Sequence, residues 1–338
     1  MDIDLILDTR ASADEIAELG QLAESAGIRG VWVSSLLDSR DPFTNLSVLA
    51  RATSRLHLGP VAVNPFDTHP VRIATAYLTL NELAGGRARL VVGGGGEALE
   101  ALDIEPRRRV RAVAECVDIL HGAASGEELN YAGELYRVRH LRLNWLDAPV
   151  PPVYVGASQS QMLRMAARVA DGIMMSDMPP ALSAQAIATL DDGLENHGRA
   201  RPGFATNAFT AWHVYADAAR ARQEAKRWLL LRGIFRPWLL AEFLSDDEVE
   251  LVMSSREAFI TAFRNGHSEV AGVPDPVLDV LVDNVTICGS LADLDSKIEK
   301  LHRFSQAGLA AISLRLYADP AESIRLLGEQ VLPAIRDL

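Results

Sequence analysis

Short apolar runs alternate with helical patterns from one end of the chain to the other. Apolar runs of about four to eight residues are typical of strands buried on both faces, and apolar residues spaced three or four apart are typical of helices. The runs predict eight strands: Ile3–Asp8, Gly30–Ser34, Leu56–Val63, Ala88–Gly93, Pro152–Gly156, Asp171–Ser176, a segment within Ala205–Ala216, and Leu309–Tyr317.

Helix signals mark the segments between these strands. Ser12 and Glu15 form a capping-box pattern before an amphipathic stretch that stops at Gly27. Further helix starts lie at Pro70, at Ser290 with Asp293, and at Asp319-Pro320. Eight strand–helix units predict an α/β fold, a (β/α)8 TIM barrel with insertions, as a single domain over residues 1–338. A doubly wound open sheet fits the same alternation and remains the alternative.

Two segments depart from this alternation. Residues 129–145 read as a hairpin, with a strand at Leu129-Asn130-Tyr131, a turn at Ala132-Gly133-Glu134 and alternating residues beyond it. Residues 220–284 are about twice the length that one helix needs and predict a helical insertion. Its aromatic residues predict either extra helices packed into a core or a dimer face, or a mobile cover over the barrel mouth. These residues are Trp228, Phe235, Trp238 and Phe243.

Composition narrows the classes of partner. The formal net charge of −12 argues against binding to nucleic acid or to an anionic membrane. Cys116 and Cys288 are far apart, so neither a disulfide framework nor a metal site is expected. The N-terminus has no basic leader, and no apolar run reaches about 18 residues. We therefore expect no signal peptide, no membrane span and a cytoplasmic location.

The glycine run at Gly93, Gly94, Gly95 and Gly96 is the strongest candidate for ligand contact. Its G-x-G-x-x-A spacing, ending at Ala98, matches the dinucleotide fingerprint, but it follows the fourth strand and a clear helical pattern begins only near Arg107. Motifs of serine hydrolases, zinc proteases and P-loop enzymes do not occur in the sequence. The run instead predicts bare backbone on which a flat ligand lies, with a flexible loop as the alternative.

Polar residues also follow other strands. Asn64-Pro65 ends the third strand, where the amide can donate and accept at a heteroaromatic edge, or can simply stop the strand in a turn. His69, before Pro70, is interpreted as a helix cap or packing residue. His213, near the end of the seventh strand, is a candidate acid, with a structural role as the alternative.

The segment from Val31 to Gly96 carries the most specific pattern of the chain. It combines G-P-x-x-x-N-P-x-x-x-H-P, from Gly59 to Pro70, with the later G-G-R and the glycine run. In this pattern the chain resembles the luciferase-like flavin and deazaflavin superfamily, and within it the methylenetetrahydromethanopterin reductases that use coenzyme F420. Similar stretches recur over residues 151–175, 287–301 and 322–335. The resemblance implies a (β/α)8 barrel with insertions and a homodimer.

The resemblance also implies where the cofactor would bind. A bulge at Val61-Ala62, with a cis peptide bond between these residues, would press on the face of the ring. Asn64 and the four glycines would line the ring and its side chain. Met175 and Ser176 would lie beside the cofactor phosphate. Backbone amides at a helix start would hold that phosphate, in the loop of Gly156, Ala157, Ser158 and Gln159.

Two departures from the family pattern concern the substrate. Ser35 and Leu36 stand where relatives that use F420 often carry Asp-His, and Ile6 stands where the reductase subgroup carries an acid. A methanopterin substrate is therefore not expected. We expect instead a diverged biosynthetic reductase or oxidase.

The leading hypothesis is an F420-dependent oxidoreductase that transfers a hydride between the deazaflavin and a small organic substrate. Candidate proton donors are Asp8, Ser34, Ser35 and His213. The alternatives are an FMN-dependent monooxygenase and a non-catalytic member that binds cofactor or serves as a scaffold.

Overall fold

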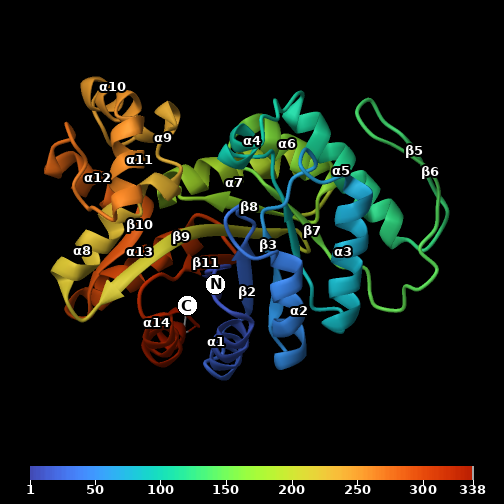
Figure 1. The fold of residues 1–338 in the computed structure, drawn as a ribbon, viewed down its shortest axis with the longest axis horizontal. Coiled ribbons are helices and arrows are strands. Elements are labelled where there is room, and N and C mark those ends of the chain that lie inside the picture. The colour runs from blue at the N-terminus through green and yellow to red at the C-terminus, as the bar shows by residue number, and fades with distance from the viewer. Residues whose placement is uncertain (337–338) are drawn as a thin grey trace.

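Parallel strands form a nearly closed barrel in the computed structural model, which describes residues 1–336, without the side chains of residues 97, 98 and 336. Neighbouring barrel strands follow the order β3-β2-β1-β11-β9-β8-β7-β4, and two isolated bridges join the β3 and β4 segments. Helices surround these strands (Figure 1). The predicted (β/α)8 barrel is thus confirmed. Its strands are β1 (Asp2–Leu7), β2 (Gly30–Ser34), β3 (His57–Val61), β4 (Leu90–Val92), β7 (Val153–Gly156), β8 (Gly172–Ser176), β9 (Ala205–Tyr215) and β11 (Ala311–Arg315).

Helices cover the outside of the barrel. The capping boxes expected at Ser12 with Glu15 and at Ser290 with Asp293 are both present, and His69 caps the helix that Pro70 starts. The helix α4 begins directly after the glycine run, earlier than the sequence pattern indicated. The covering helices are α1 (Ala13–Ser25), α2 (Pro42–Ala52), α3 (Pro70–Leu83), α4 (Glu97–Ala101), α5 (Arg109–Ala124), α6 (Ser160–Val169), α7 (Pro180–Asn196), α13 (Leu294–Gln306), α14 (Pro320–Leu326) and α15 (Leu332–Arg336).

Strand alternation divides the core into two layers. On β1, Ile3, Leu5 and Leu7 belong to the large cluster between barrel and helices, whereas Ile6 faces the barrel interior. The interior cluster takes one or two residues from each of several strands. Its buried members are Ile6, Trp32, Val61, Val91, Tyr154 and Met174.

A hairpin lies in the segment where the sequence alternation indicated one. Strands β5 (Leu129–Ala132) and β6 (Arg137–Leu141) pair antiparallel, and Gly133 donates to Tyr136 across the turn, slightly later than expected. The buried carboxylate of Glu115 accepts backbone N–H groups of this turn at 2.8 to 3.0 Å. The hairpin is therefore fastened to α5 by a polar anchor, and its residues Leu129 and Leu141 also pack against the core.

Residues 218–285 form short helices on one side of the barrel mouth (Figure 1). They are α8 (Ala218–Arg227), the 3-10 helix η1 (Leu229–Arg232), α9 (Pro237–Leu240), α10 (Asp246–Ser254), α11 (Arg256–Asn265) and α12 (Asp275–Val285). The sequence reading missed β10 (Thr286–Ser290), which pairs with the far half of the long β9. Trp228 contacts Phe263 and Tyr317, and Phe235 contacts Phe259, so these aromatics pack within the insertion and onto the end of the barrel.

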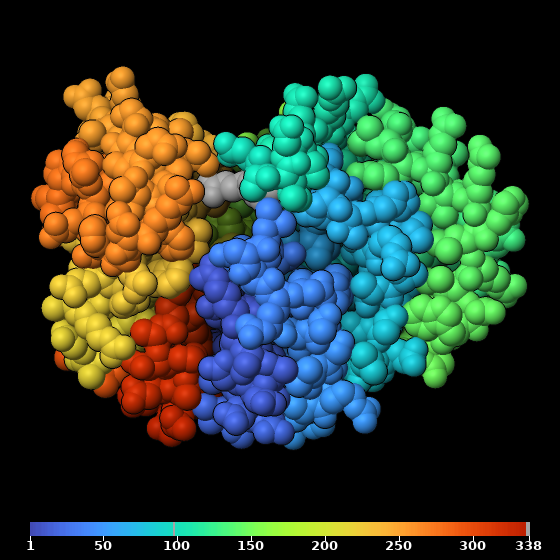
Figure 2. Space-filling model, viewed as in Figure 1, coloured from blue at the N-terminus to red at the C-terminus, as the bar shows by residue number. Residues whose placement is uncertain are grey.

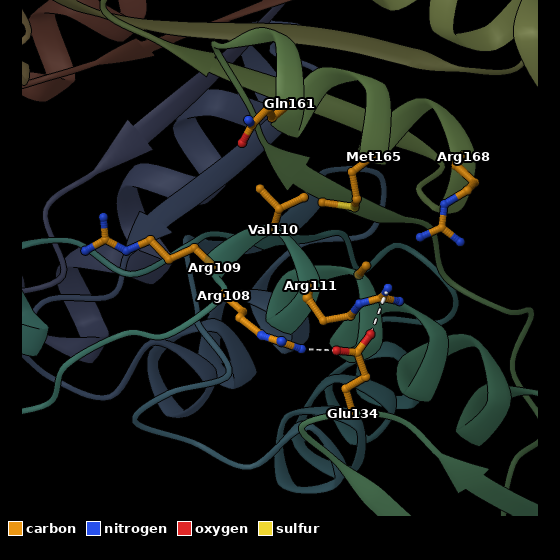
Figure 3. Close-up of a pocket in the computed structure, with 9 residues that line it drawn as sticks. Arg108, Arg109, Val110, Arg111, Glu134, Gln161, Met165 and Arg168 are labelled. Atoms are coloured by element: carbon orange, nitrogen blue, oxygen red, sulfur yellow. Dashed lines mark hydrogen bonds and ion pairs between the residues drawn. The ribbon is translucent and has the colours of Figure 1, made fainter.

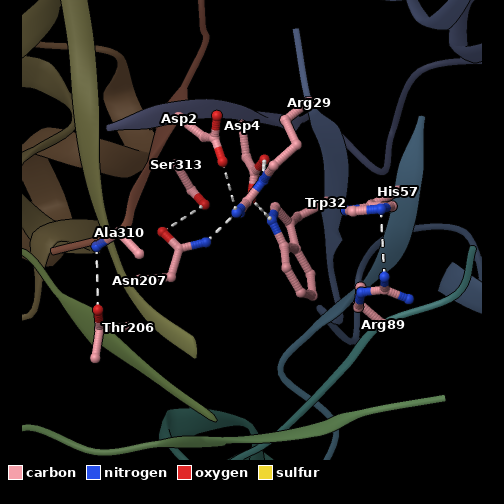
Figure 4. A network of polar contacts seen from close by, with 10 residues as sticks. All are labelled: Asp2, Asp4, Arg29, Trp32, His57, Arg89, Thr206, Asn207, Ala310 and Ser313. Carbon is pink, nitrogen blue, oxygen red and sulfur yellow. Dashed lines mark hydrogen bonds and ion pairs between the residues drawn. The ribbon is translucent and has the colours of Figure 1, made fainter. Parts of the chain in front are cut away.

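The amino-terminal end of the barrel is closed by a charged network (Figure 4). The buried carboxylate of Asp4 accepts from Arg29 at 2.6 and 2.9 Å, from Trp32 Nε1 at 2.9 Å and from Asn207 Nδ2 at 3.0 Å. Burial disfavours the charge on Arg29, but Asp4 and Asp2 more than offset this and raise the pKa of the guanidinium. Asp4 and Arg29 thus have each other as counter-charge, together with further hydrogen-bond partners, which is typical of a structural element.

Candidate functional site

A cavity of about 270 Å³ opens at the carboxyl end of the barrel. All eight barrel strands, or the residues directly after them, contribute to its wall, which is where TIM-barrel enzymes place their active sites. The space-filling view shows a hollow at this side of the molecule, between the helical insertion (orange) and the chain around residue 105 (teal) (Figure 2). The lining residues are Ile6, Ser34, Val61, Ala62, Val91, Gly156, Ala157, Ser158, Met174, Ser176, Phe209 and Arg315.

Bare backbone forms one wall of the cavity. The Val61-Ala62 peptide bond is cis, as expected from the resemblance. Gly93 N donates to Val63 O at 2.8 Å, and a Cβ added to Gly93 would lie 3.2 Å from Ala62 Cβ. A Cβ added to Gly156 would lie 3.7 Å from Gly93 Cα. The ends of β3, β4 and β7 thus approach closely because glycine removes the side chains between them, and they leave a flat surface.

The helix α6 starts at the edge of the same cavity. Its N-cap residue, Gln159, makes no side-chain cap hydrogen bond, and the amides of the first turn have no intrahelical acceptor and none among the described side chains. Ala157 N, by contrast, already donates to Met174 O at 3.2 Å. The site thus offers an anion the helix start rather than the whole predicted loop of four amides.

A second hollow of about 780 Å³ runs along α5 and α6 (Figure 3). Gln161, Met165 and Arg168 line it from one face of α6, on successive turns away from the barrel mouth. Arg108 and Arg111 pair with Glu134, whereas neither Arg109 nor Arg168 forms an ion pair with a described residue. We call this hollow the arginine groove; its lining is Arg108, Arg109, Val110, Arg111, Ala114, Glu134, Gln161, Met165 and Arg168.

Several predicted cofactor residues line the cavity itself, namely Val61, Ala62, Gly156, Ala157, Ser158 and Ser176. Met175 does not, because it is the neighbouring Met174 that faces the barrel interior while Met175 packs toward the helices. The Asn64 amide is used within its own turn: it accepts from Phe66 N and Asp67 N and donates to Asp67. The Asn64 side chain therefore stabilises a turn, which is the alternative that the sequence left open.

The four candidate proton donors are not brought together. Ser34 lines the cavity, but Asp8 accepts from Arg10 N in the loop after β1, and Ser35 is held by its backbone to Val61 O. His213 is fully buried, stacks on Tyr317 at 4.9 Å and lies outside the cavity wall. Burial and Arg232 lower the pKa of His213 to about 3, so this histidine is neutral near pH 7.

Sequence reasoning missed the charged residues of this site. Arg315 ends β11 and lines the cavity, and its Nη1 donates to Ser34 Oγ at 2.5 Å. Arg236, in the insertion, donates to the backbone and hydroxyl oxygens of Ser176 at 3.3 and 3.0 Å. A charged residue ending an apolar strand is a usable signal for Arg315, whereas nothing in the sequence around Arg236 indicated its place.

Comparison with known proteins accounts for this arrangement. The model of the family described as luciferase-like monooxygenase matches residues 2–310. The chain belongs to this family. Flavin- and F420-dependent oxidoreductases make up the family, and the substrate of the present member is not determined by membership.

Three similar proteins illustrate the range of the family. A 5,10-methylenetetrahydromethanopterin reductase of Archaeoglobus fulgidus is 30% identical over 321 residues, covering 94% of each chain. Two solved structures have the same fold at lower identity. An F420-dependent secondary alcohol dehydrogenase in complex with an F420-acetone adduct has a TM-score of 0.80 at 18% identity, covering 99% of both chains. The oxygenating constituent of 3,6-diketocamphane monooxygenase from Pseudomonas putida, in complex with FMN, has a TM-score of 0.68 at 19% identity, covering 98% of both.

No helix within residues 1–336 is both long and apolar enough to cross a membrane.

Proposed function

We propose that this chain is an F420-dependent oxidoreductase that transfers a hydride between the deazaflavin and a small organic substrate. The observation that carries the proposal is the wall formed by Ala62 and Gly156 in a cavity of about 270 Å³ at the barrel mouth, with Gly93 packed directly behind these two residues. A planar ring system can stack on such a wall, and a side chain at Gly156 would reduce the space. When bound, the cofactor supplies or accepts the hydride at its C5 carbon.

The remaining lining residues fit hydride transfer. None of the described residues in the cavity wall is an aspartate, a glutamate or a histidine. Apolar side chains such as Ile6, Val91 and Phe209 would exclude water and hold the two reacting carbons in contact. Ser34 and Ser176 are the hydroxyl groups that can pass a proton where a product needs one.

The arginine groove favours F420 over FMN. Both cofactors carry a phosphate that suits the start of α6, but only F420 continues into a chain of glutamate carboxylates. The groove begins beside that helix start, since a Cβ on Gly94 would lie within 3.8 Å of Arg109 and 3.5 Å of Met162. Arg109 and Arg168 would then meet the carboxylates, whereas FMN would leave the groove unused.

Binding titrations of the purified chain test the proposal. F420, the tailless deazaflavin FO and FMN are added in turn while the quenching of their fluorescence is followed. We expect F420 to bind at least about tenfold more tightly than FMN, equivalent to about 1.4 kcal/mol. Tight binding of FMN without binding of F420 would overturn the proposal in favour of the flavin monooxygenase.

A variant pair tests the location of the ring. Gly156→Leu places a side chain in the cavity, and we expect it to weaken the binding of both F420 and FO by at least about tenfold. Ala200→Leu adds the same side chain at an exposed turn and serves as the control. Equal affinity of Gly156→Leu and the original chain for FO would place the ring elsewhere.

A further inference from the structure

Arg315 presents a buried positive charge to the cavity without a matching negative one. The residue is only 9% exposed and lines the cavity. Its one hydrogen bond to a described residue goes from Nη1 to the neutral Ser34 hydroxyl, and it forms no ion pair with any described carboxylate. A guanidinium has five N–H donors, so most of its donors are left for another acceptor. The guanidinium also lies 5.4 Å from the centre of the Tyr317 ring, but a ring face carries no full negative charge, so this buried charge is costly to keep for structural reasons alone.

The surroundings of Arg315 add to the positive charge. Arg236 hydrogen-bonds only to Ser176 among the described residues, and Ser176 lines the same cavity. Arg232 and Asp177 form an ion pair at 3.1 Å in which both side chains are 2% exposed. The positive charges of Arg232, Arg236 and Arg315 all interact with the carboxylate of Asp177. Three positive groups therefore face one negative group. While Asp177 is ionised, the excess is two positive charges beside the cavity.

The position of Arg315 separates it from the proposed ring surface. In the ring of eight strands, β11 lies four places from β4, whose end carries the glycine run, so the two strands stand on opposite sides of the barrel. The phosphate-binding helix start follows β7, which neighbours β4. A ring stacked on the glycine wall therefore leaves Arg315 on the side where the second reactant would enter.

We propose that Arg315 binds an anionic group, a carboxylate or phosphate, of the organic substrate, with Arg236 as an additional source of positive charge. The identification of this anion with a substrate rests on the proposed function, whereas the anion site itself does not. Planar guanidinium groups bind carboxylates and phosphates through two parallel hydrogen bonds, which also orients the bound molecule. The substrate would accordingly be held by its charged end while its apolar part lies between Phe209 and the ring.

The test compares probes that differ only in charge. Benzoate and its neutral counterpart benzamide are titrated by calorimetry into the chain, both without cofactor and with saturating F420. We expect benzoate to bind at least about tenfold more tightly than benzamide, and Arg315→Met to remove this preference. Arg315→Lys keeps the charge and should retain part of the preference. Arg51→Met removes an exposed arginine of α2, far from the cavity wall, and as the control should leave benzoate affinity unchanged.

Each outcome bears on a different statement. Equal affinity of the original chain and Arg315→Met for benzoate overturns the anion site, whether or not F420 binds. Loss of F420 affinity in Arg315→Met with unchanged benzoate binding would make Arg315 a cofactor contact and also overturn it. Failure of the original chain to bind F420, with benzoate binding that still depends on Arg315, would overturn the proposed function and leave the anion site standing. If Arg315→Met does not fold, two other measurements decide whether the anion site stands: the benzoate affinity of Arg315→Lys, and the preference of the original chain for benzoate over benzamide.

Discussion

The two ends of the barrel treat buried charge in different ways. At the amino-terminal end, Asp4 is surrounded by the donors of Arg29, Trp32 and Asn207, and the ion pair is complete. At the carboxyl end, Arg315 and Arg236 contact serine oxygens and form no ion pair with a described carboxylate. The same chain thus satisfies a buried charge fully at one end and leaves charges available at the other.

This contrast separates residues that hold the fold from residues that can bind. A complete network gains nothing from a ligand, because every donor and acceptor already has a partner. An incomplete one gains free energy when a ligand supplies the missing partner. The polar atoms Arg232 Nε, His213 Nε2 and Tyr317 Oη are buried without hydrogen-bond partners in the described structure, and all three lie at the carboxyl end. The carboxyl end is therefore where substitutions should change binding, and the amino-terminal end is where they should change stability.

Removal of the Asp4 charge should have the largest effect. In Asp4→Asn the half-buried guanidinium of Arg29 loses its buried carboxylate partner, and breaking one partner of a buried ion pair typically costs about 3–5 kcal/mol. Urea unfolding measures the loss, and F420 affinity under folding conditions should stay the same. Asp2→Asn, which removes an exposed partner of the same arginine, should cost less than about 1 kcal/mol. A similar cost for both variants would contradict the structural role of the network.

Acid should destabilise the protein partly through His213. Burial and Arg232 hold its folded pKa at about 3, well below the value in the unfolded chain, so the unfolded state binds the extra proton as the pH falls. Stability due to this group is present above about pH 6.5 and is lost as the pH falls toward 3, by at most about 1.4 kcal/mol per pH unit. His213→Phe, which keeps a ring against Tyr317, should flatten this slope in unfolding measurements at several pH values.

Two further results would locate the role of His213. His197→Gln, at an exposed position after α7, should leave the slope as it is. Turnover with F420 in His213→Phe should stay within about threefold of the original, because a histidine outside the cavity wall transfers no proton. A much larger loss of turnover, with F420 affinity unchanged, would restore His213 as a candidate acid.

Asp177 should oppose anion binding at the carboxyl end. Burial raises the pKa of Asp177 to about 6, against the opposing effect of Arg232, Arg236 and Arg315, so its negative charge is present at pH 8 and largely absent at pH 5. Asp177→Asn should therefore raise benzoate affinity by about 1 kcal/mol at pH 8 and much less at pH 5. It also breaks the buried ion pair with Arg232, so the free energy of unfolding should fall as well. Calorimetry at both pH values measures the difference, with Asp295→Asn on the exposed face of α13 as the control. An equal gain at both pH values would contradict the titration of Asp177.

Removal of a charge along the arginine groove should have the smallest effect, a modest loss of F420 affinity. Arg168→Gln should weaken F420 binding by about 0.5–1 kcal/mol at low salt, because an exposed ion pair contributes little and salt screens it. FO, which lacks the charged tail, should bind as before. Equal losses for F420 and FO would show that the substitution disturbs α6 rather than a contact with the tail.

The sequence predicted the barrel well because its signals are local. Apolar runs, capping boxes and proline starts depend on residues a few positions apart, and the eight barrel strands lie at or within a few residues of the predicted segments. The sequence did not predict the strand β10, because Thr286–Ser290 follows α12 without a turn signal and pairs with β9 beyond the barrel. Its place depends on a partner some 75 residues away in the chain, as in the hydrogen bond from Thr210 to Val285 O.

The orientation of side chains at the site was less predictable. β8 is apolar on both faces, so the sequence does not say whether Met174 or Met175 enters the barrel. Asn64 suits a ligand contact or a turn equally by type, and only the position of Asp67 decides for the turn. The cis bond at Val61-Ala62 came from the family pattern, not from the residue types alone.

The sequence by itself determined the elements, their order and the family to which the chain belongs. Only the tertiary structure decided which charges are paired. Arg29 and Arg315 are both arginines next to apolar strands, yet one meets Asp4 and the other meets Ser34, 281 positions away in the chain. Local patterns specify secondary structure because they act over one turn or one strand. Whether a buried charge is paired depends on which distant residues the closed barrel brings beside it.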